Sequence, residues 1–337
     1  MRVSIIIVNW NGLRHLPECL ESLESQSFRD FETIVVDNGS QDGSLEYLRS
    51  RPEVVLVPLP ENAGFAAGNN AGLPLARGEY VVTLNNDTRA EPDWLERLVQ
   101  VADRHPEAGM VASRICAYHD PELIDSLGMA ICRDGMSRGD FRGRRFSELG
   151  LPPVREILFP SACVALYRRA MLDEIGFFDP DFFAYCEDTD LGLRGRLAGW
   201  GAVLARDAVV YHKYSMTSGA FTPFKLYLVE RNHYFAAVKN LPMPLLLLLP
   251  LFTVGRYLRQ AQVVFSGQGS GGEFQESGAM SACIWALTRG MRDALLALPV
   301  LLRKRAALRQ KRRISNSDTM RLLKRYRLTF KELLDIF

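Results

Sequence analysis

The first hundred residues alternate short apolar runs with amphipathic segments, and this order constrains the fold more than any other feature of the sequence. The first two runs are mainly apolar and rich in β-branched residues, as strands buried on both faces of a sheet are. The pattern predicts strands at residues 3–10, 31–40, 54–59 and 80–87, with helices at 15–26 and 43–51. This order predicts an α/β fold with a largely parallel sheet and helices on its faces.

Polar residues collect where the predicted strands end. Right-handed crossovers put the carboxyl ends of parallel strands at one edge of the sheet, where ligands bind. The clusters are Asn9 and Asn11 after the first strand, residues 37–42 after the second and residues 85–87 after the fourth. Each cluster alone also suits an ordinary turn, because Asn, Asp, Gly and Ser are common turn residues. Three clusters on one edge favour a binding site.

A further segment, "ENAGFAAGNNAGL" (61–73), places small residues and amides just before a predicted helix. Gly64 and Gly68 would let the backbone approach a ligand closely, because glycine has no Cβ. The start of the helix offers unpaired N–H groups to an anion. The segment therefore predicts a further part of the binding site.

The composition is that of a globular chain of 337 residues, 47% hydrophobic and 24% charged, which suits one large core or two unequal domains. Six scattered cysteines without a C-x-x-C pair argue against a zinc ribbon and a disulfide framework, and favour a reducing compartment. The apolar run at the N-terminus is too short for the core of a signal peptide. We therefore expect no export through a cleaved signal.

The sequence pattern changes after Asn240. Residues 241–254 form an apolar run with three prolines, shorter than the roughly 20 residues of a spanning helix. Residues 283–313 combine apolar positions with Arg and Lys, which is typical of an amphipathic helix on an anionic membrane surface. Eleven Lys or Arg and one acid lie between residues 303 and 327, whereas the rest of the chain is net acidic. This contrast predicts that tail and body face different partners, the tail a membrane surface.

Two other interpretations of the basic tail stay open. The cations would also suit a solvated helical face, or a nucleic-acid contact. No interleaved aromatic residues and no familiar nucleic-acid module accompany them in the sequence. We therefore expect a membrane partner and no nucleic acid.

Acidic residues are concentrated between Asp179 and Asp190, where five of twelve residues are acids and none is basic. Mutual repulsion would raise the pKa of at least one of them, which suits a group that must accept a proton. Glu187, Asp188 and Asp190 lie at the start of a predicted helix that ends at Gly199. Acids in a first turn also act as helix caps, and we favour this structural role for Asp190 and catalysis for Asp188.

Five segments together resemble a family 2 glycosyltransferase of the GT-A fold, closest to its rhamnosyltransferase-like branch. They are "SIIIVNWNG", "VVDNGSQDGS", "ENAGFAAGNNAG", "LNNDT" and "FFAYCEDTDLGLRGRLAGW". The resemblance follows the family's order over roughly residues 1–235, and it is specific as a set. It implies a GT-A catalytic domain at 1–235, followed by an apolar and basic helical region at 236–337 on the membrane interface.

The resemblance implies a divalent cation, Mn²⁺ or Mg²⁺, beside the donor diphosphate. Asp87 stands where relatives carry a D-x-D motif, and a carboxylate at a strand end suits such a cation. Asn85 replaces a usual acid, so we expect weaker metal binding. His212 corresponds to a histidine that some members use on the metal, although a hydrogen-bonded histidine at a strand end is the alternative.

The resemblance also assigns the other site residues. Asp188 is implied as general base, with Glu187 as its support or as a contact of the acceptor hydroxyl. Asp37 would contact the pyrimidine ring. The other donor-binding residues would be Asn9, Asn11, Asn38, Asn62, Gly64, Asn69 and Asn86. The sugar and acceptor pocket would be lined by Ser161, Ala162 and Cys163. No activating base is evident beside Cys163, so a buried small residue is expected there and not a nucleophile.

The function that follows is inverting, metal-dependent transfer of a sugar at the cytoplasmic membrane face. The donor would be a dTDP- or UDP-sugar, with rhamnose suggested by family proximity, and the acceptor a lipid-linked or cell-surface polysaccharide. The missing acid of the metal motif leaves a second hypothesis, a non-catalytic nucleotide-sugar or glycan-binding module on a degenerate GT-A fold. A third is a scaffold in which the basic tail is the function.

Overall fold

The computed structural model of the chain describes residues 1–213, 222–265 and 280–334. Its strands are β1 (Val3–Asn9), β2 (Phe31–Asn38), β3 (Val54–Leu59), β4 (Tyr80–Leu84), β5 (Thr88–Ala90), β6 (Ala108–Ala117), β7 (Ile124–Ser126), β8 (Met129–Ile131), β9 (Ser137–Gly139), β10 (Val154–Glu156), β11 (Val164–Arg168) and β12 (Gly201–His212). Its α-helices are α1 (Leu16–Glu24), α2 (Ser44–Arg49), α3 (Gly64–Gly72), α4 (Trp94–Arg104), α5 (Arg169–Ile175), α6 (Glu187–Leu197), α7 (Pro223–Asn240), α8 (Met243–Phe265), α10 (Met280–Arg309), α11 (Asn316–Arg325) and α12 (Phe330–Leu334). The four strands and two helices expected near the N-terminus are all present.

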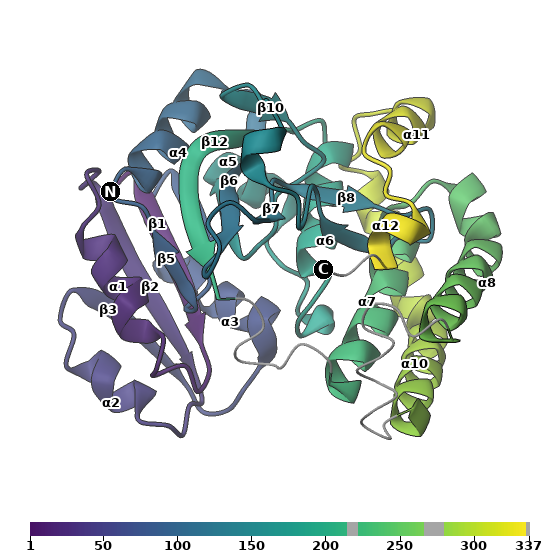
Figure 1. The fold of residues 1–337 in the computed structure, drawn as a ribbon, viewed down its shortest axis with the longest axis horizontal. Coiled ribbons are helices and arrows are strands. Elements are labelled where there is room, and N and C mark those ends of the chain that lie inside the picture. Colours follow the sequence, from purple (N-terminus) through teal and green to yellow (C-terminus); the bar gives the residue numbers. More distant parts are fainter. Residues whose placement is uncertain (214–221, 266–279, 335–337) are drawn as a thin grey trace.

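One mixed sheet runs through the molecule in the order β10-β12-β6-β11-β4-β1-β2-β3. Strands β3, β2, β1 and β4 are parallel to one another, β12 is parallel to β6, and β11 runs antiparallel between β4 and β6. In Figure 1 the parallel N-terminal strands lie on the left and β12 curves over the middle of the molecule. The mixed, mostly parallel α/β sheet is therefore as the sequence predicts.

The core lies on both faces of this sheet, because alternate residues of each buried strand point to opposite sides. Ile5 and Ile7 of β1 belong to the core that α1 and α4 cover. Ile6 belongs to the opposite core, which includes Ala66 of α3 and Leu191 of α6. Helices on both faces fix β1 in the centre of the sheet and leave the carboxyl ends of the strands for the polar clusters.

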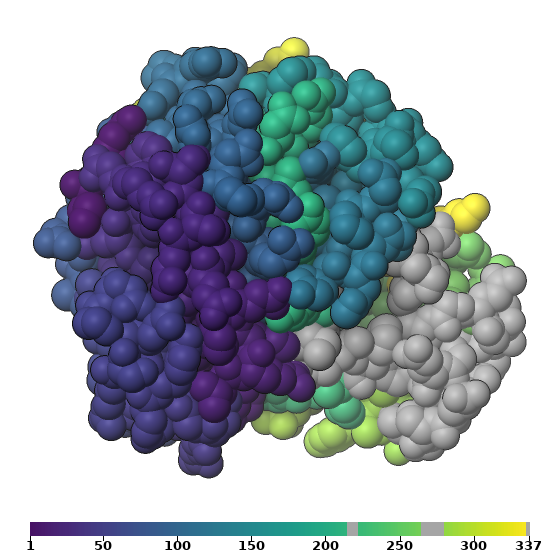
Figure 2. Space-filling view, turned by 60° about the vertical axis from the view of Figure 1, so that its left-hand side comes forward, coloured from purple at the N-terminus to yellow at the C-terminus, as the bar shows by residue number. Residues whose placement is uncertain are grey.

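The C-terminal helices pack beside the sheet at the right-hand end of the molecule, and they stay there when it is turned (Figures 1 and 2). Phe235 of α7 forms an apolar cluster with Ala294 and Leu301 of α10 and with Phe182. The boundary expected between residues 235 and 236 falls inside α7. No helix in the described part of the chain is long and apolar enough to cross a membrane.

The basic tail returns to the acidic body and forms ion pairs with it, while the membrane contact expected of the tail stays a prediction. Lys304 pairs with Asp179 at 2.6 Å, Arg313 with Glu174 at 2.7 Å and Arg325 with Glu156 at 2.7 Å. Beyond α11 the chain adds a short parallel bridge to β8. The opposite net charges of tail and body therefore attract each other within one folded unit.

Candidate active site

The carboxyl ends of β1, β2 and β4 lie next to one another, and a buried polar network joins them. Asn9 and Asp37 are partners in the β1–β2 register. Asn9 Nδ2 donates to Asp37 Oδ1 at 3.2 Å, and Asn86 Nδ2 donates to Asn9 Oδ1 at 2.7 Å. All three side chains are buried. The predicted clusters therefore form one site, and Asn11 stands at its exposed rim with its Oδ1 accepting from the backbone of Gln41.

The expected donor segment begins α3 beside this network. Asn38 Nδ2 donates to Asn62 Oδ1 at 3.0 Å, and the Gly64 amide donates to the same oxygen at 2.9 Å. Gly64 has φ +87°, and a Cβ there would lie 2.5 Å from the carbonyl oxygen of Phe183. Glycine is therefore required at this contact, because it alone tolerates both the angle and the close approach. Asn69 lies buried one turn further along α3.

Asp87 and His212 approach each other at the end of β12, as a shared cation site requires. His212 Nε2 lies 3.4 Å from Asp87 Oδ1, and both side chains are buried. Among the described residues this carboxylate oxygen has no hydrogen-bond partner. Burial opposes ionisation of Asp87, but His212 outweighs it and lowers the pKa of the carboxyl. A buried carboxylate oxygen 3.4 Å from an imidazole nitrogen fits a Mn²⁺ or Mg²⁺ ion held between the two side chains.

Asp125 of β7 fixes the orientation of His212, and nothing in the sequence pointed to it. Its Oδ2 lies 2.7 Å from His212 Nδ1, so the other ring nitrogen is left toward Asp87. A carboxylate behind a histidine is the usual support of a metal-ligating imidazole. Within the described residues no group of three or more His, Cys, Asp or Glu is arranged to hold a metal. Asp87 and His212 are two groups that could hold an ion shared with a diphosphate.

Glu187, which is buried, and Asp188, which is partly buried, open α6. Burial and the neighbouring Asp188 raise the pKa of Glu187 well above its usual value, and burial raises the pKa of Asp188. In the part of the chain that the structure describes, Glu187 Oε2 has no hydrogen-bond partner. The raised pKa expected for this acidic stretch is therefore present, but burial contributes more than repulsion.

Asp190 is structural, but not as a helix cap, so that prediction was wrong. Its carboxylate accepts from Arg194 Nε at 2.8 Å and pairs with Lys239 of α7 at 2.8 Å. Asn240 Nδ2 donates to the other oxygen at 2.8 Å. Burial opposes ionisation, but Lys239 and Arg194 outweigh it and lower the pKa of Asp190 to about 2. Asp190 therefore joins α6 to α7 through buried charge.

The segment expected to line the sugar and acceptor pocket connects these parts. Asp188 Oδ2 accepts from the Ala162 amide at 3.3 Å, and the Asn85 amide donates to the Cys163 carbonyl at 2.9 Å. The Cys163 amide contacts Ser161 Oγ at 3.4 Å. Cys163 is only partly buried, whereas a buried residue was expected, and desolvation raises the pKa of its thiol. Residues 161–163 thus lie between the acid pair of α6 and the end of β4.

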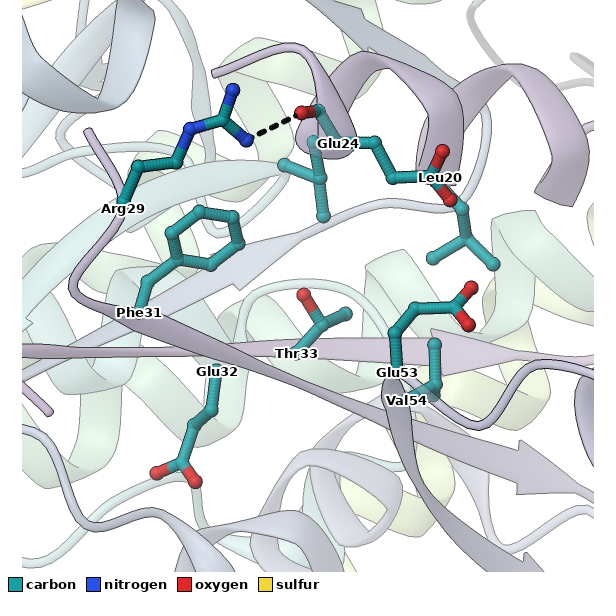
Figure 3. Close-up of a pocket in the computed structure, with 9 residues that line it drawn as sticks. Leu20, Glu24, Arg29, Phe31, Glu32, Thr33, Glu53 and Val54 are labelled. Atoms are coloured by element: carbon teal, nitrogen blue, oxygen red, sulfur yellow. Dashed lines mark hydrogen bonds between the residues drawn. The ribbon is translucent and has the colours of Figure 1, made fainter. Parts of the chain in front are cut away.

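A separate surface pocket of about 250 Å³ lies away from this edge. It is formed by the end of α1 and the first residues of β2 and β3, including Glu24, Phe31 and Val54 (Figure 3). It therefore opens at the amino ends of the parallel strands. The residues predicted for binding and catalysis do not line it.

The comparisons with known proteins agree with this arrangement. The pattern described as "Glycosyl transferase family 2" matches residues 4–176, about half of the chain. The chain belongs to this family. The predicted family is confirmed, and the chain is a glycosyltransferase. A Mycobacterium tuberculosis relative, N-acetylglucosaminyl-diphospho-decaprenol L-rhamnosyltransferase, is 28% identical over 237 residues, 64% of this chain and 77% of the relative.

Two solved structures confirm the GT-A fold of this family 2 member. Residues 1–349 of S. aureus TarS with UDP-GlcNAc match at TM-score 0.56 and 19% identity, over 97% of this chain and 91% of that one. GalNAc-T7 with UDP, GalNAc and Mn²⁺ matches at TM-score 0.58 and 15% identity, over 71% of this chain and 48% of that one. Identity this low shows the fold alone.

Proposed function

We propose that this glycosyltransferase moves a sugar, with inversion, from a UDP- or dTDP-sugar to a hydroxyl of a lipid-linked or cell-surface polysaccharide, with Mn²⁺ or Mg²⁺ bound. The observation that carries the proposal is the position of Asp188. Its carboxylate contacts the Ala162 amide, in the segment that links α6 to the strand end before Asp87. A base, an acceptor segment and a cation site thereby share one edge of the sheet.

In the proposed reaction Asp188 takes the proton of the acceptor hydroxyl, whose oxygen then bonds to the anomeric carbon of the sugar. The bond from that carbon to the diphosphate oxygen breaks, and the nucleoside diphosphate leaves with the electron pair. One displacement inverts the anomeric centre. Glu187, buried beside Asp188, would support the base or contact the acceptor hydroxyl.

Asp87 and His212 would hold the cation, with Asp125 behind the imidazole. The bound cation would neutralise charge that gathers on the leaving diphosphate. Asp37 would contact the pyrimidine ring, beside Asn9 and Asn38, and residues 62–69 would line the rest of the donor. Because Asp87 is the single carboxylate of the metal motif, we still expect weak metal binding.

The donor and acceptor classes are supported by the relatives. The M. tuberculosis relative is named for rhamnose transfer to a decaprenol-diphosphate-linked sugar. The TarS and GalNAc-T7 structures are described with UDP, UDP-GlcNAc or Mn²⁺. These names favour a pyrimidine nucleotide and a polyprenyl-linked acceptor for this chain, with rhamnose as the first sugar to test.

Titration calorimetry tests the donor site. UDP, dTDP and GDP are titrated into the protein with and without Mn²⁺, and again into Asp87→Ala. We expect a pyrimidine diphosphate to bind only with metal, and Asp87→Ala to lose that binding. Glu91→Ala, which removes an acid further along the same segment, serves as control and should bind like wild type. Equal binding without metal, or by Asp87→Ala, would contradict the cation site.

The exposed faces of the C-terminal helices favour attachment to an anionic membrane. On α8, Met243, Leu247, Leu251, Val254 and Leu258 are each more than half exposed. On α10, the exposed Trp285 has Arg289 and Arg292 nearby along the helix, and both arginine side chains are more than half exposed. Apolar residues with tryptophan and cations suit the interface of a bilayer.

Because the basic tail pairs with the body, we assign the main membrane contact to α8 and α10. Residues 236–337 would then form the peripheral anchor of the catalytic region at 1–235, on the cytoplasmic face. Flotation with phosphatidylglycerol vesicles tests this, with phosphatidylcholine vesicles for comparison. We expect wild type to float with the anionic vesicles and the double variant Leu247→Glu/Leu251→Glu to stay behind. Leu75→Glu is the control, because Leu75 is an exposed leucine far in sequence from α8 and α10, and this variant should float like wild type. A dimer that the double variant splits, without vesicle binding, would assign the face to self-association instead.

A further inference from the structure

The loop at residues 182–186, which leads directly into Glu187 and Asp188, has an unusual backbone. Phe183, Tyr185 and Cys186 have φ of 63°, 70° and 63°. None is glycine, and side chains rarely adopt these left-handed angles. At Phe183, with ψ −70°, the Ala184 amide donates to the Phe182 carbonyl at 2.8 Å. This is the γ-turn of the rare, strained hand.

Such a backbone persists only where surrounding contacts hold it. Asn232 of α7 provides them, since its Nδ2 donates to the carbonyls of Phe182, Ala184 and Tyr185, each at 2.8 Å. Its side chain is fully buried. Arg231 Nε donates to Asn232 Oδ1 at 2.9 Å, so the amide group is fixed with its NH₂ toward the loop.

The loop also touches the donor segment. The Ala66 amide of α3 donates to the Phe183 carbonyl at 3.0 Å, next to the close approach of Gly64. Lys304 of α10 holds the preceding residues through Asp179 and Asp181. The 182–186 loop therefore lies between the donor helix on one side and α7 on the other.

We propose that Asn232 is a positioning residue that holds the 182–186 loop in its left-handed conformation and thereby sets the acid pair of α6 against the acceptor segment. The proposal rests on the proposed role of Asp188 as base. Asn232 touches no reacting atom and acts through the backbone of the loop. Its removal should free the loop, lower kcat and leave donor affinity nearly unchanged.

Hydrogen exchange followed by mass spectrometry tests the loop without any substrate. In Asn232→Ala we expect amides of residues 182–190 to exchange at least tenfold faster. Gln26→Ala is a matched control, because Gln26 is also a fully buried amide side chain with hydrogen bonds to the Ser22 and Glu91 carbonyls and the Leu95 amide. It should leave exchange in this loop unchanged. Unchanged exchange in Asn232→Ala, or an equal rise in Gln26→Ala, would overturn the proposal.

Kinetics then separate positioning from a general loss of stability. Release of UDP from UDP-GlcNAc or of dTDP from dTDP-rhamnose is measured with the donor that wild type uses. We expect Asn232→Ala to lower kcat ten- to a hundredfold with donor KM within twofold. Cys186→Gly in the same chain should recover at least threefold of kcat, because glycine adopts the left-handed angle without strain. If the double variant has the same kcat as Asn232→Ala, Asn232 does not act by offsetting backbone strain in the loop.

Two further variants keep the outcomes distinct. If Asn232→Ala does not fold, Arg231→Ala removes the bond that orients the amide, together with its own bonds to the Asp181 and Phe182 carbonyls, and should raise loop exchange by a smaller factor. No rise there would count against the proposal. Asp188→Asn is run alongside: if it keeps full activity, the base assignment fails, whereas a dead Asp188→Asn with an unaffected Asn232→Ala rejects only the positioning role.

Discussion

The first turn of α6 carries buried carboxylates in two opposite environments. Asp190 faces Lys239 of α7 and Arg194 of its own helix, and each of these cations lies 2.8 Å from its carboxylate. Glu187 and Asp188, three and two residues earlier, form no ion pair among the described residues. Asp188 accepts hydrogen bonds from the Ala162 and Thr189 amides and from the Thr189 hydroxyl, and among the same residues Glu187 Oε2 has no hydrogen-bond partner. The pKa of Asp190 is lowered, whereas the pKa values of Glu187 and Asp188 are raised.

The contrast separates structure from chemistry within one helical turn. A buried charge with close partners holds two elements together, and removing one partner is costly. A buried carboxylate without a cation destabilises the fold, so its presence needs another reason, and proton transfer provides one. Substitutions of these acids should therefore change different properties of the protein.

The largest effect is expected from Asp188→Asn. The amide keeps the shape of the side chain but takes no proton from an acceptor hydroxyl, so kcat should fall about a thousandfold, within the range of general-base catalysis. Turnover of the donor with the accepted saccharide is the measurement. Nucleoside diphosphate binding should stay within twofold of wild type. A loss of less than tenfold would exclude Asp188 as the base.

Asp190→Asn should affect stability more than chemistry. Lys239 and Arg194 would lose a buried partner, and breaking such a pair costs about 3–5 kcal/mol of unfolding free energy. Lys239 keeps its contact with Asp179 at 2.7 Å, so the lower end is expected. Urea unfolding gives the value, with Asp188→Asn as control in the same buffer. An Asp190→Asn protein as stable as wild type would mean that contacts other than Asp190 hold α6 and α7 together.

Much of this arrangement was predictable from the sequence. Apolar β-branched runs gave the parallel strands, and parallel strands bring their carboxyl ends together, so the meeting of Asn9, Asp37 and Asn86 followed from topology. A raised pKa near Asp188 was predicted from the density of acids, but burial is its larger cause. The roles of these residues in catalysis and binding stay predictions.

The remainder depends on contacts that no local pattern encodes. Asp125 reaches His212 because a three-residue strand pairs with β6, and a strand this short has no periodicity. The cap predicted for Asp190 followed a rule for local structure, but Lys239 and Asn240 lie about fifty residues away and determine its role. The same distance in sequence separates Asn232 from the loop that it holds.

Glu187→Gln should do the opposite of Asp190→Asn and stabilise the fold. Because its folded-state pKa is raised, Glu187 costs stability as pH rises above its unfolded value, and the amide resembles the protonated form. A higher unfolding free energy than that of wild type is expected at pH 7. Urea unfolding at pH 7 and pH 4.5 should show the gain shrinking at the lower pH. A Glu187→Gln protein less stable than wild type at both pH values would contradict the inference that the Glu187 carboxylate lacks a stabilising partner.

The smallest expected effect is the acid dependence of the Asp190 contact. With a folded-state pKa of about 2, this carboxyl adds stability above its unfolded pKa, and the contribution is lost as pH falls toward 2. The stability gap between wild type and Asp190→Asn should therefore narrow by about 1 kcal/mol between pH 5 and pH 3. Asp207→Asn, which removes an acid from an exposed pair with Arg206, is the control and should show little change. The pKa of Asp190 is lowered, whereas the pKa values of Glu187 and Asp188 are raised. A stability difference between wild type and Asp190→Asn that widened toward pH 3 would therefore mean that Asp190 is not the ion-paired carboxylate of this turn.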